Sequence, residues 1–167
     1  MAATASAGTI RCRHAEPAPA PEPVPQAGGS FGAVDPQFIP PSFGVVANQG
    51  RVDSVTCTGI NGALIPCNCP PARDDAKFLG GLNAALTQGF FPNPSIKTPI
   101  TLAKFNDASD KSPNTNKQRA TAMIQVMQSL SGTLGKGCPG VSFPTLINQQ
   151  RTGEFGVLPA SVGNAGK

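Results

Sequence analysis

Four cysteines constrain the fold of this chain more than any other feature. They are Cys57, Cys67, Cys69 and Cys138, and a fifth, Cys12, lies near the start. A zinc site made of cysteines needs two closely spaced pairs, such as C-x2-C. This chain has one C-x-C and no second pair, so we expect two structural disulfides and no metal. Structural disulfides indicate an oxidising compartment outside the cytosol.

The spacing favours one of the three ways to pair these four cysteines. A Cys67–Cys69 bond would close a very small and strained ring. A Cys57–Cys67 bond instead crosses a predicted hairpin, and a Cys69–Cys138 bond joins the start of one predicted helix to the end of another. We therefore expect Cys57–Cys67 with Cys69–Cys138, and the second choice is Cys57–Cys69 with Cys67–Cys138. Cys12 lies outside both.

A β-hairpin is predicted around the first disulfide. Residues 55–57 and 63–65 form two short apolar and β-branched runs. Between them lies Asn61-Gly62, a dipeptide that favours tight hairpin turns because both residues tolerate a positive φ.

Two helices are predicted from apolar residues at three- and four-residue spacing. The first is expected over 70–89, where Gly80 and Gly81 lower its propensity but favour close approach of another helix. The second is expected over 114–134, with Arg119 among its outward polar positions. The expected fold class is mainly α, with small α+β as the alternative. It comprises an antiparallel helix pair and a short hairpin, is rich in loops, and is held by both disulfides.

The chain divides into a tail, a domain and a second tail. Residues 1–30 include five prolines at alternate positions from 17 to 25, which favour an extended segment without a packing face. We expect 1–30 to be disordered or processed, 31–153 to form the domain, and 154–167 to fray. The first dozen residues lack the apolar core of a secretory signal. Their Ser, Ala and Arg content leaves an organelle-targeting segment or a misassigned start as alternatives.

Charge and hydropathy argue against nucleic-acid binding and against a membrane-spanning helix. The chain has 13 basic and 9 acidic residues, for a net charge of +4. The basic residues are scattered, whereas nucleic-acid binding needs them clustered. No apolar run reaches the roughly 18 residues that a membrane-spanning helix needs. We therefore expect neither nucleic-acid binding nor a transmembrane segment.

Catalytic residues are scarce. The one histidine, His14, lies in the predicted tail. Two carboxylate pairs remain, Asp74 with Asp75 and Asp107 with Asp110. The first suits a helix start, where negative charge meets the positive end of the helix dipole, and the second suits a polar turn. We expect no catalysis and no cofactor; a small extracellular hydrolase that uses these carboxylates is the alternative.

A partner contact is predicted in the proline-rich segment 90–113, which we expect to cross the surface. Phe90, Phe91 and Ile96 are its apolar residues near turns. The alternative is that they cover the open side of the helix pair.

The chain also resembles a group of small secreted fungal proteins. The resemblance lies in residues 43–49 (FGVVANQ), 57–73 (CTGINGALIPCNCPPAR) and 135–139 (GKGCP) and covers about 43–150. It implies secretion and a disulfide-bonded domain, and no particular activity. Together these features predict a non-enzymatic interaction, effector or wall-associated module, whose partner is an unidentified protein or wall component.

Overall fold

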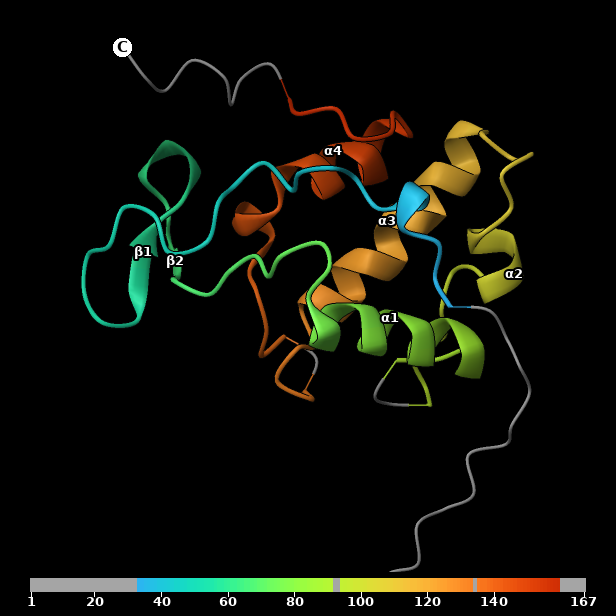
Figure 1. Ribbon diagram of the computed structural model, residues 1–167, viewed down its shortest axis with the longest axis horizontal. Helices are drawn as coiled ribbons and strands as arrows, with labels where there is room; N and C mark the ends of the chain where they lie inside the picture. The colour runs from blue at the N-terminus through green and yellow to red at the C-terminus, as the bar shows by residue number, and fades with distance from the viewer. Residues whose placement is uncertain (1–32, 92–93, 134, 160–167) are drawn as a thin grey trace, which may run out of the picture. The chain divides into compact units, whose positions relative to one another are not determined.

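The computed structural model describes residues 33–91, 94–133 and 135–159. All of these belong to one unit, residues 31–167. Within the described ranges, four α-helices and a two-stranded antiparallel sheet form a small α+β fold (Figure 1). The elements are β1 (Thr56–Thr58), β2 (Leu64–Pro66), α1 (Ala76–Gln88), α2 (Leu102–Phe105), α3 (Pro113–Met127) and α4 (Pro144–Thr152). Three short 3-10 helices lie at Pro36–Phe38, Ile60–Gly62 and Gly140–Ser142. The predicted tail 1–30 and Cys12 lie outside the described residues.

The predicted hairpin is confirmed. β1 pairs with β2 so that Cys57 faces Ile65, and the turn between them holds Asn61 and Gly62 at φ values of 56° and 75°. Both predicted disulfides, Cys57–Cys67 and Cys69–Cys138, are also present. The first belongs to a small apolar cluster of Cys57, Ile65 and Cys67, which is separate from the main core.

Helix α1 starts later than predicted, and ends where predicted. Residues 70–75 precede it, because the carboxylate of Asp75 accepts the backbone N–H groups of Lys77 and Phe78 and so caps the helix there. Gly89 ends the helix in the left-handed conformation, which glycine adopts without a steric penalty.

Helix α3 starts at Pro113 behind a cap at Ser112 and ends at Met127, seven residues before the predicted end. The carbonyl of Met127 accepts the N–H of Cys138. A side chain at Gly137 would collide with that same carbonyl, so glycine allows the returning chain to lie against the helix end. Its close approach brings Cys138 toward Cys69.

The helix pair that we predicted is not confirmed, because α3 has two helical neighbours. It packs most extensively on α4 and also on α1 (Figure 1). Helix α4 spans Pro144–Thr152 and lies outside both of the predicted helices. Residues after α4 also make contacts: the amide of Asn148 donates to the carbonyl of Val157. The segment 154–159, predicted to fray, thus lies against α4, and 160–167 are outside the described residues.

The segment 90–113 contributes to the main core rather than only crossing the surface. Its buried apolar side chains are Phe91, Ile100, Leu102 and Phe105, and it contains α2. The prolines of this segment predict a surface loop. In the structure, the apolar residues of the segment belong to the same core cluster as those of α1 and α3.

Arg119 is buried, contrary to its predicted place on a polar helix face. Its residue is 1% exposed. The guanidinium donates to the carbonyls of Phe105, Asp107 and Asp110 at 2.7–2.9 Å. It also stacks on the ring of Phe38, 4.2 Å from the ring centre. Burial lowers the pKa of Arg119, but an arginine stays protonated under all ordinary conditions. The buried charge is thus satisfied by carbonyl oxygens.

Replacing Arg119 should destabilise the fold strongly. Arg119→Met keeps most of the volume but leaves three carbonyls without their donor. We expect the free energy of unfolding to fall by about 3 kcal/mol, measured by urea denaturation. The control, Arg51→Met, removes an exposed arginine and should change it by less than about 0.5 kcal/mol. Equal effects of the two substitutions would contradict a structural role for Arg119.

The two disulfides should stabilise different parts of the chain. Cys69–Cys138 spans 69 residues and Cys57–Cys67 spans 10, so loop entropy gives losses of about 4 and about 3 kcal/mol on replacement by serine pairs. The Cys57→Ser/Cys67→Ser variant should speed amide hydrogen exchange in the hairpin while α3 stays protected. The Cys69→Ser/Cys138→Ser variant should reduce protection in α1 and α3. Identical exchange profiles would show that the two clusters unfold as one.

Candidate binding groove

A groove lies between α1 and the end of α3, and we name it the α1–α3 groove. Its volume is about 290 Å³. Its apolar walls are formed by side chains from α1, from the segment after α1, from the C-terminal part of α3 and from the residues after α3: Ala84, Ala85, Phe90, Phe91, Val126 and Leu130. Grooves of this kind, with apolar walls and a few polar groups, are the usual form of a binding site.

Gly81 determines how closely the two walls approach. A Cβ atom placed at Gly81 would lie 3.2 Å from a methyl group of Val126, which is tighter than an ordinary contact. The expected close helix approach is therefore found at Gly81. At Gly80 nothing lies within 4 Å of such an atom, so helix packing does not require a glycine at this position.

The structure places Phe90, Phe91 and Ile96 in one bend after α1. The N–H of Phe91 donates to the carbonyl of Ile96 at 2.9 Å, and Phe90 pairs with Lys97 in an isolated bridge. Phe91 is 2% exposed and belongs to the core, whereas Phe90 and Ile96 are half-buried. Phe90 and Phe91 line the groove. Phe91 thus has the covering role that we gave as the alternative; partner contact through Phe90 and Ile96 stays a prediction.

The groove contains two polar features that sequence reasoning missed. Ser129 lines it and is 8% exposed, and its buried hydroxyl has no hydrogen-bond partner. Lys77 is the one charged side chain in the described part of the lining. Neither residue lies in a recognisable motif, so only the packing of α1 on α3 identifies them.

A second pocket adjoins the groove beside the Cys69–Cys138 disulfide. It has a volume of about 410 Å³ and shares Lys77 and Leu130 with the groove. Its other charged side chains are Lys136 and Asp75. Since Asp75 already accepts two backbone N–H groups as the cap of α1, the ammonium groups are the charges without a fixed partner in this lining.

The predicted carboxylate pair Asp107 and Asp110 forms a structural turn. Lys104 Nζ lies 2.6 Å from a carboxylate oxygen of Asp110 and 3.2 Å from one of Asp107. Asp110 also accepts the N–H of Ser112 and the hydroxyl of Thr115. These bonds, that of Lys104 above all, hold the pKa of Asp110 well below its ordinary value. A general acid or base works best with a pKa near the operating pH, and this carboxylate is far from it.

The other predicted pair, Asp74 and Asp75, is also placed at the start of α1. Asp75 caps the helix, and Asp74 is exposed one residue before it. The geometry therefore gives both pairs the structural reasons that we expected for them: a helix start and a polar turn.

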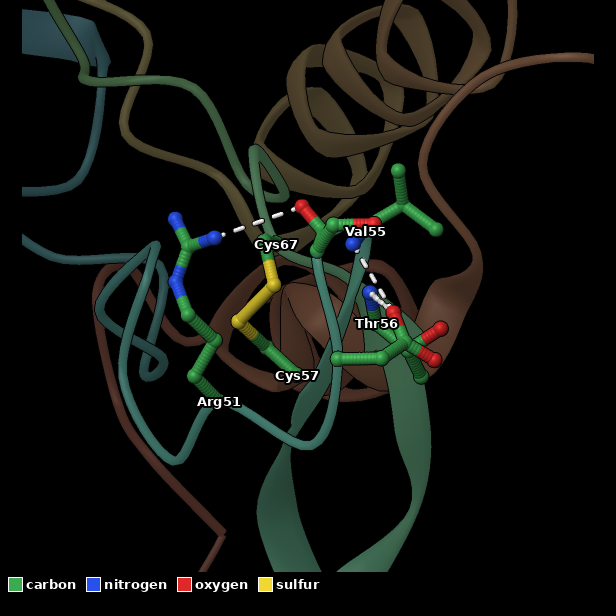
Figure 2. The surroundings of a disulfide bond; sticks show 7 residues. Arg51, Val55, Thr56, Cys57 and Cys67 are labelled. Atoms are coloured by element: carbon green, nitrogen blue, oxygen red, sulfur yellow. Dashed lines mark hydrogen bonds between the residues drawn. A yellow bond between two sulfur atoms is a disulfide. The ribbon is translucent and has the colours of Figure 1, made fainter.

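The hairpin carries a second surface of interest. Figure 2 shows the Cys57–Cys67 disulfide with Arg51 on one side and Val55 and Thr56 on the other. Four apolar side chains around the hairpin are between 59% and 69% exposed: Val46, Val52, Val55 and Leu64. The outer edge of β1 is already paired with residues 50–52. The outer edge of β2 ends in Pro66, which has no N–H to offer an added strand.

The described residues contain no group of three or more histidine, cysteine or acidic side chains that could hold a metal ion. Among the helices of the described ranges, none is long and apolar enough to cross a membrane.

The turn around Asp110 should make stability depend on pH in the acid range. Its pKa in the folded chain lies below the ordinary value of 3.8, so the ionised carboxylate stabilises the fold above that value. This contribution declines as the pH falls through it. The melting temperature of Asp110→Asn should therefore lie below that of the parent near neutrality, and the difference should narrow between about pH 5 and about pH 2.

The control for this measurement is Asp74→Asn, which removes an exposed carboxylate outside the turn. Its melting temperature should stay close to that of the parent throughout. A difference between Asp110→Asn and the parent that does not change with pH would contradict the ion-paired role of Asp110.

Comparison with known proteins provides no relative from which the fold or the groove could be interpreted. No family model, no curated protein and no solved structure matches this chain. The resemblance to small secreted fungal proteins stays a prediction.

Proposed function

We propose that this chain is a secreted fungal binding module, which acts as an interaction, effector or wall-associated protein and does not catalyse a reaction. The observation that carries the proposal is the α1–α3 groove, whose apolar walls include Phe90 and Phe91. An extracellular protein or a wall component would place an apolar group there. The two disulfides support an oxidising environment, where such bonds persist.

The charge arrangement supports binding over catalysis. Three of the four candidate carboxylates are engaged, Asp75 in capping α1 and Asp107 and Asp110 in the Lys104 turn. The groove itself is lined by apolar side chains, Lys77, Gln88 and Ser129, and by no acidic side chain in its described part. A nucleophile and a base within hydrogen-bond distance of each other are the usual requirement for acyl transfer. Ser129 has no such base.

The surface outside the groove also suits a partner of moderate size. The exposed apolar residues around the hairpin provide further contact area on the same unit. Exposed apolar side chains of this kind can add contact area to an interaction surface.

A pair of single substitutions on α1 tests the proposal. Ala84 is exposed and lines the groove, whereas Thr87 is exposed and lies outside its lining. Leucine favours helices about as well as any residue other than alanine, so Ala84→Leu fills the groove without disturbing the core. Thr87→Leu adds the same side chain elsewhere. Both variants should keep the melting temperature of the parent.

The measurement is capture by the immobilised, oxidised full chain from separate fractions of purified wall polysaccharide and extracellular protein. Each captured component is then purified, and its Kd is measured. We expect Ala84→Leu to weaken binding at least about tenfold, or about 1.4 kcal/mol, and Thr87→Leu to bind like the parent. Equal binding by both variants would contradict binding through the groove. Turnover of a captured component that is lost in Asp110→Asn would contradict the non-catalytic proposal.

A further inference from the structure

We infer that the α1–α3 groove binds a small amphipathic carboxylate, with its apolar chain along Ala84 and Phe90 and its carboxylate at Lys77. The inference rests on the proposed function and names the chemistry of the ligand. Its three supports are the apolar character of the walls, the sign of the charge in the lining, and an unsatisfied hydroxyl in the same lining.

The walls suit a hydrocarbon chain. Ala84 is exposed in the lining, and Phe90 and Leu130 are half-buried there. Phe91 and Val126 lie beneath them as core residues, and Gly81 adds no side chain to the space between the helices. A volume of about 290 Å³ gives room for a short hydrocarbon chain.

The charge at the groove selects an anion. Lys77 is the one charged side chain in its described lining, and Lys136 follows in the adjoining pocket. The adjoining pocket also contains one carboxylate, Asp75, which accepts the N–H groups of Lys77 and Phe78 at 2.9 Å. The two linings together thus hold two lysines and one carboxylate that is already engaged as a helix cap, which favours a negatively charged head group.

The hydroxyl of Ser129 gives an independent reason to expect a polar ligand group. It is buried without a partner, which is unfavourable in a protein interior. Ser129 and Lys77 both line the groove. A carboxylate bound in the groove would offer this hydroxyl the acceptor that it lacks.

The probe for this inference is decanoate, used below the concentration at which it forms micelles. Binding to the oxidised, nitrogen-15-labelled full chain is followed by amide chemical shifts. We expect saturable shifts in residues 77–91 and 126–132. Decyltrimethylammonium has the same chain length and the opposite charge, and it should bind at least tenfold more weakly. Binding that is equally strong for both probes would overturn the assignment of an anionic head group.

Three substitutions test the assigned roles. Ala84→Leu should abolish saturable binding, and Lys77→Gln should weaken it about two- to fivefold, as expected for an exposed charge pair. Ser129→Ala should weaken decanoate binding without lowering the melting temperature of the free chain, because the parent hydroxyl has no partner to lose. The controls Thr87→Leu and Lys111→Gln should bind like the parent. A lower melting temperature for Ser129→Ala with unchanged affinity would show a structural role instead.

The outcomes separate this inference from the proposed function. If decanoate causes no saturable shift while Ala84→Leu still prevents capture of a purified partner, the carboxylate inference is wrong and the binding module stands. If decanoate binds elsewhere on the chain, the groove assignment is wrong. If neither decanoate nor any purified component binds the groove, both are wrong.

Discussion

The buried guanidinium of Arg119 is the interaction on which the rest of the main core depends. Through its planar donors it joins α3 to three carbonyls of the segment 105–110. Its face stacks on Phe38, which precedes the hairpin. Phe38 in turn meets Phe105 edge to face. Segments far apart in the sequence thus converge on one charged group. Burial of an unpaired charge is very unfavourable, so these segments must be in place together for the core to form.

Local rules predicted the parts of the fold that local chemistry determines. The turn at Asn61 and Gly62, the two disulfides and the end of α1 at Gly89 follow from positive φ values and cysteine spacing. Apolar periodicity alone places the start of α1 too early and the end of α3 too late. In the structure, the carboxylate of Asp75 caps α1, and the chain returns at Gly137 against the end of α3. Arg119 was assigned to a polar face, because a pattern of residue types cannot show that carbonyl groups from another segment will surround one position.

The candidate site was predictable only in part, for the same reason. Phe90 and Phe91 were identified from apolar residues beside prolines, and they do line the groove. Phe91 is buried in the main core, whereas partner contact through Phe90 stays a prediction. Lys77 and Ser129 were not identified, since a lysine in a first helical turn and a serine after a helix are unremarkable in sequence. They become informative only once α3 lies against α1, which brings the hydroxyl, the ammonium group and the apolar walls together.

The position of the groove follows from the long-range disulfide. Cys69 precedes α1 and Cys138 follows α3, and these two helices are the walls of the groove. Gly137 lets the chain return against the end of α3, which places Cys138 beside the start of α1 and Lys77 near Leu130. The covalent bond therefore limits how far the walls can separate at the end where the charged groups lie. Helix packing at Gly81 and Val126 sets their distance about one turn further along α1. A groove whose walls are fixed in this way is already formed before a ligand arrives, so binding loses little free energy in ordering the protein.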